Sequence, residues 1–233
     1  MARLKRLVIP AFWRVPRKEN KWVVAPRPGP HKKLESVPLQ VLVRDVLKIL
    51  EKGKEARTII KRGEILVDGR KRKDHAYPVG LFDVVSVPAT GKSFRAVPSS
   101  KVLSFVEIPA ADAKHKICKI VGKTVTRKGK MQLNLHDGKN ILVDKKEFKT
   151  GDSLLLTLPD LKIVEHIPLE VGVTGIVTRG VDVGKVGKVK KVMHATSKEH
   201  TRLICDFGGE DQEVLKERFF VLGKGKPAIN IGE

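Results

Sequence analysis

A helix, a glycine stop and a β-hairpin are predicted in succession by the run Ala56-Arg57-Thr58-Ile59-Ile60-Lys61-Arg62-Gly63-Glu64-Ile65-Leu66-Val67-Asp68-Gly69. The helix should cover residues 54–62, and Gly63 ends it because glycine readily adopts the left-handed conformation found after many helices. Residues 64–67 predict a strand, and Asp68-Gly69 is a strong signal for a two-residue hairpin turn. The return strand begins at Arg70, and a further strand is expected over residues 81–87.

A longer helix is predicted upstream of this run, over residues 36–52. Ser36 can cap its N-terminus, Pro38 suits its first turn, and Gly53 is expected to end it. One apolar stripe follows helical spacing through Leu39, Leu42, Val43, Val46 and Leu50. Two helices and a hairpin should therefore surround one small core.

Positive charges gather on the second predicted helix and beyond the hairpin turn. Lys54, Arg57 and Lys61 fall at helical spacing, which places them on one outer face. Four adjacent charges, Arg70-Lys71-Arg72-Lys73, follow the turn, and this hairpin should lie beside the helix. The two sets form a candidate phosphate-binding surface, with ordinary solvated charge as the alternative.

The whole chain is strongly basic, with 47 Lys and Arg against 26 Asp and Glu and a formal net charge of +21. Solubility of a small domain needs a net charge of only about 2–8, so the excess favours a polyanionic partner. Nucleic acid fits, because its phosphates bind Lys and Arg and release condensed counterions. No apolar run approaches the roughly 20 residues that span a bilayer. No apolar segment typical of a secretory signal follows the basic start, so a cytoplasmic protein is expected.

Residues 1–38 form a distinct segment with ten Lys and Arg, two acids and six prolines. Proline lacks a backbone donor and disfavours helix before it, so an extended, irregular basic arm is expected. Phe12, Trp13 and Trp22 lie among the charges. Such rings could stack on RNA bases, or the two tryptophans could anchor the arm on its own protein.

The rest of the chain is rich in short β-strands. Strands are predicted over residues 116–126, 131–136, 140–143 and 153–158, with Asp137-Gly138 as a hairpin signal. This spacing favours a small barrel. From Val171 onward, glycines alternate with Val and Ile as a tightly bent second barrel requires, and lysines including Lys185 and Lys188 decorate the stretch.

Signatures of catalysis or of bound cofactors do not emerge. Gly91-Lys92-Ser93 ends like a phosphate-binding loop but lacks the required first glycine, and His194 and His200 have no companions that would complete a metal site. Cys118 and Cys205 are far apart and are most simply small core residues in a reducing compartment. These absences weigh against an enzyme, a metal site and a cofactor, without excluding an active site assembled from distant residues.

The helix–helix–hairpin segment resembles the alpha-L RNA-binding domain, which occurs in small-subunit ribosomal protein four and in several RNA-modifying enzymes. Residues 180–189 resemble a KOW motif. The order of these modules resembles the e-type (archaeal and eukaryotic) family of ribosomal protein four of the small subunit. Three further runs support this resemblance: Gly29-Pro30-His31-Lys32-Lys33-Leu34, residues 132–138 and Phe220-Val221-Leu222-Gly223. One departure from the wider alpha-L pattern is Gly80-Leu81-Phe82-Asp83 in place of a Gly-Asp pair, a variant that suits the e-type family.

This resemblance implies an α+β, mostly β fold in four parts. They are an extended basic arm over residues 1–38, an alpha-L RNA-binding domain over 39–105, a central small β-barrel over 106–170, and a C-terminal SH3-like KOW barrel with its tail over 171–233. It also implies a structural constituent of the small ribosomal subunit. Its partners would be small-subunit ribosomal RNA and neighbouring ribosomal proteins, with no membrane and no small-molecule substrate, in the cytoplasmic ribosome.

The implied RNA-binding residues follow from the same resemblance. In the alpha-L family the second helix and its hairpin contact structured RNA, which maps here onto Lys54, Arg57, Lys61, Arg62, Arg70, Lys71, Arg72 and Lys73. The arm and the glycine-rich stretch add Arg3, Lys5, Arg6, Arg14, Arg17, Lys18, Arg27, His31, Lys32, Lys33, Lys185 and Lys188.

Two other classes stay open on sequence alone. One is an RNA-modifying enzyme guided by an alpha-L domain, which would need a catalytic domain in the roughly 80 residues between the two binding modules, and small barrels rarely hold deep pockets. The other is a KOW-type transcription factor, which would associate with RNA polymerase.

Overall fold

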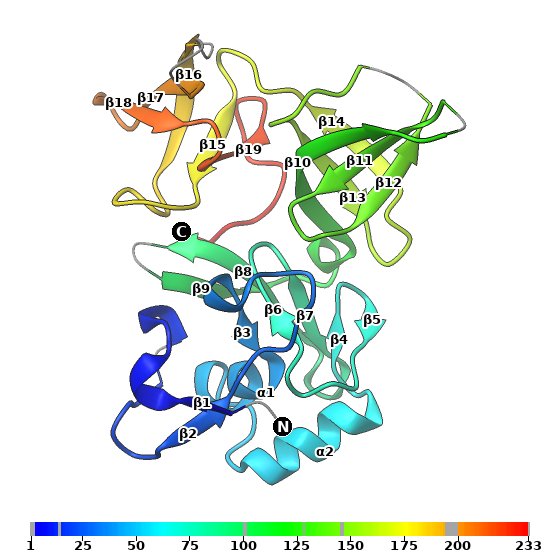
Figure 1. Cartoon of the computed structure of the whole chain (residues 1–233), viewed down its shortest axis with the longest axis vertical. Helices are drawn as coiled ribbons and strands as arrows, with labels where there is room; N and C mark the ends of the chain where they lie inside the picture. Colours follow the sequence, from blue (N-terminus) through cyan, green and yellow to red (C-terminus); the bar gives the residue numbers. More distant parts are fainter. Residues whose placement is uncertain are drawn as a thin grey trace. The chain divides into compact units, whose positions relative to one another are not determined.

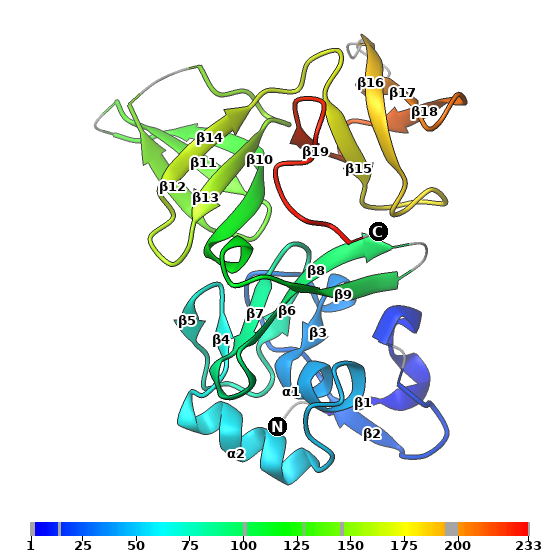
Figure 2. The same cartoon turned by 180° about the vertical axis from the view of Figure 1, so that it is seen from behind.

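The computed structural model describes residues 3–13, 15–99, 102–127, 129–144, 147–193 and 200–232. It divides into two compact units, which are Met1–Val97 with Val102–Lys114, and Pro98–Lys101 with His115–Glu233. Both units are mostly β, and the two α-helices belong to the first (Figures 1 and 2). Among the described residues, no helix has the length and apolar character needed to cross a membrane.

The N-terminal segment has more structure than an irregular arm. Strand β1 (Arg3–Lys5) pairs antiparallel with β2 (Trp22–Val24), and two short 3-10 turns, η1 (Arg6–Val8) and η2 (Ala11–Trp13), lie between them. Trp13 is fully buried, and its Nε1–H donates a 2.9 Å hydrogen bond to the Ser36 carbonyl. The prolines do exclude a long helix, but the apolar side chains of the segment, including Ile9, Val15 and Val23, join the core of the first unit.

The first predicted helix is shorter than expected. It comprises α1 (Leu39–Val41) and one π-helical stretch, η4 (Leu42–Val46), and Lys48 then turns the chain out of the helix with φ of 52°. Ser36 caps no helix, because its hydroxyl donates instead to the Lys32 carbonyl at 2.9 Å. The next two residues form β3 (Val37–Pro38), which pairs with β6 (Pro78–Val79).

The second helix, α2 (Gly53–Arg62), ends as predicted. Gly63 has φ of 77°, and its N–H donates to the Ile60 carbonyl at 2.9 Å. The expectation that Gly53 terminates the preceding helix is wrong, because that helix has already ended and Gly53 opens α2.

The predicted hairpin is confirmed. Strands β4 (Leu66–Val67) and β5 (Arg70–Lys71) pair across Asp68 and Gly69, which both have positive φ, of 52° and 71°. Such a pair of left-handed residues matches the twist of the flanking strands. The hairpin opens a five-stranded sheet of order β5-β4-β7-β8-β9, completed by β7 (Val84–Val87), β8 (Lys92–Ser99) and β9 (Val102–Ile108). Strand β7 begins later than predicted because Phe82 has φ of 59° in a turn.

One core holds the helices, this sheet and the N-terminal segment together. Its members are fully or nearly buried and include Leu39, Leu42, Val43, Ile60, Ile65, Val67 and Val85. The apolar stripe of the first helix and the inward side of α2 meet in this core. The opposite face of α2 is therefore left for polar and charged residues.

The second unit contains two five-stranded sheets. The first has the order β12-β11-β10-β13-β14, formed by β10 (His115–Val125), β11 (Met131–Leu135), β12 (Asn140–Val143), β13 (Ser153–Thr157) and β14 (Ile163–Ile167). Four of these strands are close to their predicted bounds, and β14 was not predicted. Cys118, Ile120, Leu133, Leu154 and Leu156 form the core of this sheet.

The other sheet of the second unit has the order β18-β17-β16-β15-β19. Its strands are β15 (Thr174–Val177), β16 (Val186–Met193), β17 (Arg202–Asp206), β18 (Asp211–Leu215) and β19 (Phe219–Gly223). Gly175 is required here, because a Cβ at this position would collide with the Phe219 ring and lie 2.5 Å from the Phe220 carbonyl oxygen. Cys205 and Cys118 are both buried and form no disulfide, so both cysteines are core residues as predicted.

Candidate nucleic-acid interface

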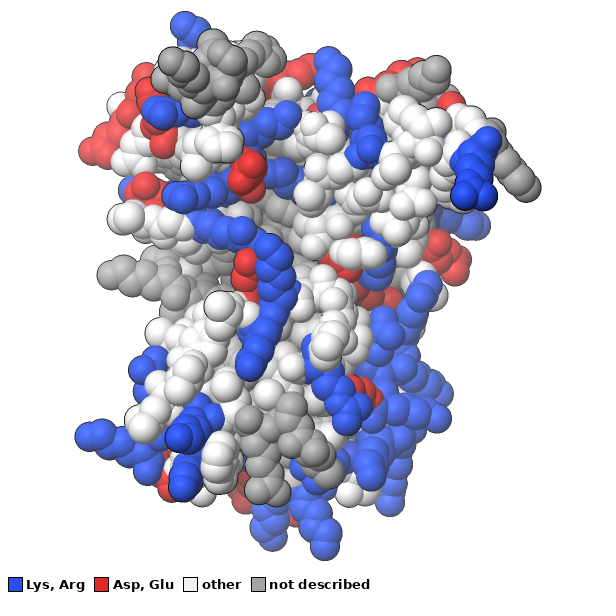
Figure 3. Space-filling view, in the orientation of Figure 1, with Lys and Arg blue, Asp and Glu red and all other residues white. Residues whose placement is uncertain are grey.

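The cations of α2 and of the hairpin lie side by side on the first unit. A Cβ placed on Gly63, at the end of α2, would be 3.6 Å from Lys71 Cβ and 3.8 Å from Lys73 Cε. The intervening Arg72 N–H donates to the Ile65 carbonyl at 3.2 Å, which fixes the return of the hairpin against the end of the helix. Figure 3 shows Lys and Arg gathered over this part of the molecule, around β4, β5 and α2.

Most of these side chains are open to solvent. Lys54, Lys61, Arg62, Arg70, Lys71 and Lys73 are exposed, whereas Arg57 and Arg72 are half-buried. The Arg72 guanidinium lies 4.5 Å from the centroid of the Tyr77 ring, a distance at which the cation and the ring attract. Within the described part of the chain, the buried Nε atoms of Arg57 and Arg72 have no hydrogen-bond partner.

His75 marks the convergence of these charges, and no sequence signal pointed to it. Burial lowers the pKa of His75, and the positive charges of Arg57, Arg27 and Lys61 lower it further, against the opposing effect of Asp74. Arg27 comes from the N-terminal segment and is 3.3 Å from Asp74, with its side chain still half-exposed. We use "basic patch" for the nine residues Arg27, Lys54, Arg57, Lys61, Arg62, Arg70, Lys71, Arg72 and Lys73.

Some members of the basic patch lie close to acids. Arg62 is 3.8 Å from Glu64, and Arg27 pairs with Asp74 as described. Both contacts involve partly exposed side chains, where ion pairs contribute about 0–1 kcal/mol and exchange readily. These two ion pairs can therefore be exchanged for contacts with a polyanion.

Two of the predicted RNA-binding residues are buried and face the protein interior. Arg6 donates from Nη1 to the Pro16 carbonyl at 2.7 Å and lies 3.6 Å from Glu19. His31 Nε2 is 2.9 Å from Asp83 Oδ2, with side chains only 6% and 2% exposed. Neither side chain lies on an exposed surface, because both are used within the protein to hold the N-terminal segment.

The Asp83 carboxylate explains the variant run at residues 80–83. The same Oδ2 atom accepts the Gly80 N–H at 2.9 Å, and a Cβ on Gly80 would collide with the His31 ring. A turn with glycine at its start and a buried aspartate at its end therefore accommodates the His31 side chain.

The remaining predicted cations are dispersed. Lys5, Arg17, Lys18, Lys32 and Lys33 are exposed on the N-terminal segment. Lys185 and Lys188 are exposed on the second unit, where Lys185 Nζ is 2.7 Å from Asp182. Arg14 and the side chain of Arg3 lie outside the described residues.

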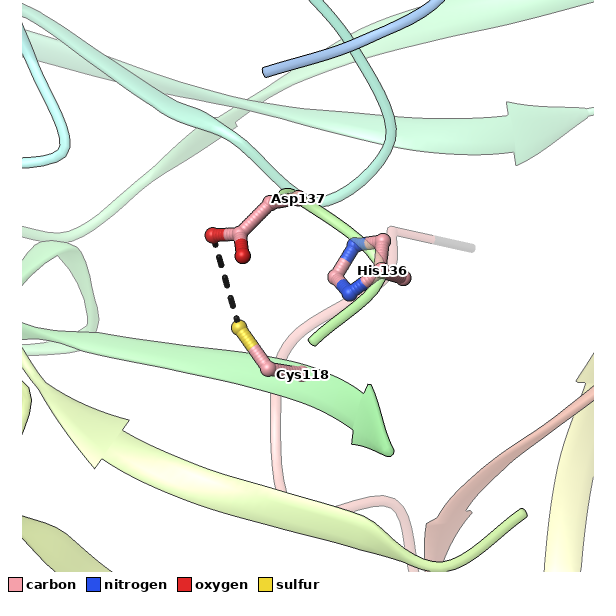
Figure 4. Close-up of side chains that lie close together, drawn as sticks. All are labelled: Cys118, His136 and Asp137. Carbon is pink, nitrogen blue, oxygen red and sulfur yellow. Dashed lines mark hydrogen bonds between the residues drawn. The ribbon is translucent and has the colours of Figure 1, made fainter. Parts of the chain in front are cut away.

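A buried cluster in the second unit brings together Cys118, His136 and Asp137, whose potential ligand atoms all lie within 4.8 Å of one another (Figure 4). The Cys118 thiol donates to Asp137 Oδ2 at 3.8 Å. The same oxygen is 3.1 Å from the Nζ atoms of both Lys116 and Lys139.

This arrangement suits a structural ion pair better than a metal site. Burial alone would raise the pKa of Asp137, but Lys116, His136 and Lys139 hold it well below its usual range. His136 Nδ1 accepts the Lys119 backbone N–H at 3.3 Å, which uses a potential ligand nitrogen. A metal cation would have to sit beside two ammonium groups that already neutralise the carboxylate.

The fold and the basic patch define a class, that of basic, mostly β proteins built around an S4 domain, which matches residues 37–85. Residues 2–34 match the RS4NT (NUC023) domain, and residues 90–163 match the Ribosomal family S4e.

Similarity to characterised proteins extends over nearly the whole chain. Small ribosomal subunit protein eS4 of Methanothermobacter thermautotrophicus is 44% identical, over 98% of this chain and 95% of its own length. Its counterpart from Archaeoglobus fulgidus is 43% identical, over 98% and 97%. The crystal structure of 30S ribosomal protein S4e from Thermoplasma acidophilum superposes with a TM-score of 0.71 at 30% identity, over 82% of this chain and 96% of that one. The chain belongs to the family of small ribosomal subunit protein eS4, which confirms the resemblance drawn from the sequence.

Proposed function

We propose that this protein is a structural constituent of the small ribosomal subunit and binds ribosomal RNA mainly through the basic patch. One observation supports the basic patch as the RNA-binding surface. Arg27 of the N-terminal segment and Arg57 and Lys61 of α2 converge around His75, and Lys71 and Lys73 of the hairpin lie beside the end of α2. Family membership supplies the biological setting, since the relatives are small-subunit proteins.

The patch has the chemistry that phosphate recognition needs. Lys ammonium groups act as mobile point charges, whereas Arg guanidinium groups can bind phosphate oxygens with two parallel hydrogen bonds. Arg72 is oriented by Tyr77, so less side-chain entropy is lost when it binds. Contacts of this kind position a protein on RNA by shape and backbone, without reading base sequence.

Two further modules follow the S4 domain in this proposal. We assign residues 106–170 to a small β-barrel and residues 171–233 to an SH3-like KOW module, each supported by a five-stranded sheet with tight glycine turns. The exposed Lys185 and Lys188 would add phosphate contacts there. Neighbouring ribosomal proteins complete the expected partners, and the cytoplasmic ribosome is the expected location.

The two alternative classes gain no support. The relatives match over nearly their full length and carry the names of small-subunit proteins, not of RNA-modifying enzymes or transcription factors. A catalytic role is not proposed.

Sedimentation tests this function. A tagged copy expressed in an archaeal host should sediment with small ribosomal subunits and remain with them at moderate salt. Co-purification with RNA polymerase instead, or sedimentation only as free protein, would overturn the proposal.

A further inference from the structure

Trp22 is exposed on a strand whose next residue is buried. Its relative exposure is 43%, whereas Val23 is 6% exposed and Trp13, the other tryptophan of the chain, is fully buried. Side chains on a strand alternate between faces, so β2 turns Val23 to the core and the indole ring outward. A large part of this apolar ring is therefore open to a partner.

Two lysines lie next to Trp22, and further cations lie in the adjoining connection. Lys21 Nζ is 5.6 Å from the centroid of the Trp22 ring. Lys5, which is exposed, lies directly opposite Trp22 in the β1–β2 register. Arg17 and Lys18 are also exposed in the connection between the two strands, and the neighbouring acid Glu19 is 3.6 Å from Arg6.

We propose that Trp22 is a stacking platform for an unpaired base of bound RNA. The inference rests on the proposed function and adds a second contact of a different kind to the basic patch. An indole ring offers a flat face to any base, and the lysines around it can meet the flanking phosphates. A base within a duplex is already stacked on both sides, so the site selects single-stranded or looped RNA.

A protein partner is the competing occupant of this surface. Leu7 and Val8, which follow β1, are 70% and 66% exposed and would suit an apolar protein contact. Charge favours RNA, because residues 3–24 contain seven Lys and Arg and a single acid. The cores of protein interfaces, by contrast, are depleted of charged residues and of lysine in particular.

Intrinsic fluorescence can test the stacking directly, because the chain has two tryptophans and one is buried. Adding single-stranded poly(A) RNA to the full-length protein should quench the Trp22 emission. Inorganic polyphosphate, which carries charge without bases, should bind and leave the emission nearly unchanged. The variant Trp22→Phe retains only the Trp13 emission, which poly(A) should not quench.

Affinity for poly(A) provides a second measurement. Trp22→Leu keeps an apolar side chain but cannot stack, and it should weaken binding by about 5- to 150-fold, the range expected for one stacked base. Trp22→Phe keeps an aromatic ring and should lose less affinity for poly(A) than Trp22→Leu. Val125→Ala, a matched change at another exposed apolar residue, should leave the affinity unchanged. Thermal unfolding of each variant verifies that the fold is intact.

The fluorescence and affinity measurements distinguish a failure of the stacking site from a failure of the proposed function. If poly(A) binds with no Trp22 quenching and Trp22→Leu binds like the wild type, the stacking site is wrong although RNA binding stands. If small-subunit ribosomal proteins quench the Trp22 emission and RNA does not, the partner at this surface is a protein. If neither poly(A) nor small-subunit ribosomal RNA binds, the proposed function itself fails.

Discussion

The ammonium group of Lys119, on β10, donates a 2.7 Å hydrogen bond to the backbone carbonyl of Phe219, on β19. The same ammonium donates to the carbonyls of Lys216 at 2.8 Å and Glu217 at 3.1 Å. One buried side chain therefore joins the two sheets of the second unit. Burial, with Lys216 nearby, lowers the pKa of Lys119 to about 8.

This buried lysine predicts a specific pH dependence of stability. The unfolded chain titrates Lys119 near 10.5 and the folded chain near 8, so between these values the unfolded chain binds more protons. The free energy of unfolding of the wild type should therefore rise with pH across this window, relative to Lys119→Met, by about 3 kcal/mol at most. Urea unfolding of both proteins at several pH values measures the difference. If the free energy of unfolding changes with pH in the same way in both proteins, burial does not lower the pKa of Lys119.

The Lys116–Asp137 pair predicts acid sensitivity. Asp137 has a lowered pKa in the folded protein, so its contribution is present above the ordinary carboxyl pKa and is lost as the pH falls toward the folded value. Asp137→Asn removes the carboxylate that lies 3.1 Å from the buried Lys116 ammonium and should cost about 3–5 kcal/mol at neutral pH.

The difference between Asp137→Asn and the wild type should narrow below about pH 4, where carboxylates begin to protonate. As a control, Lys116→Met combined with Asp137→Leu removes both charges and should recover much of the lost stability. A double variant that is no more stable than Asp137→Asn would contradict this account of the pair.

The N-terminal segment should be folded without RNA. Trp13→Ala removes a fully buried ring and should lower the free energy of unfolding by about 3–5 kcal/mol. Limited proteolysis of free wild-type protein should spare residues 4–38, and the variant should be cut there first. Rapid trimming of the free wild-type protein to residue 34 would contradict this prediction.

Local signals in the sequence predicted local structure well. Asp68-Gly69 and Gly63 specify left-handed backbone, and the structure has positive φ at all three positions. The basic patch followed from helical spacing on α2 and from four adjacent charges beyond the turn. Its main surface was therefore predictable, because both features need only short-range rules.

The structure of the N-terminal segment and the positions of Arg6, His31 and His75 depend on tertiary contacts. Ten cations and six prolines suggested an irregular arm, but five dispersed buried apolar residues, including Trp13, were enough to dock it. Arg6 and His31 resemble exposed cations in sequence, and only the fold shows their carbonyl and carboxylate partners. His75 is a single histidine with no motif, and its position among Arg27, Arg57 and Lys61 depends on three separate segments.

The salt dependence of ribosomal RNA binding tests the basic patch most directly. Affinity of the wild type should fall by roughly 10³–10⁵ between about 50 and 200 mM salt if six to ten phosphates are contacted. Arg57→Ala with Lys61→Ala should weaken binding and reduce the slope of log affinity against log salt by about two units. The control pair Glu210→Ala with Asp211→Ala should not weaken binding, and thermal unfolding should be nearly unchanged in both. Wild-type affinity and slope in the Arg57/Lys61 variant would contradict the assignment of the basic patch to ribosomal RNA.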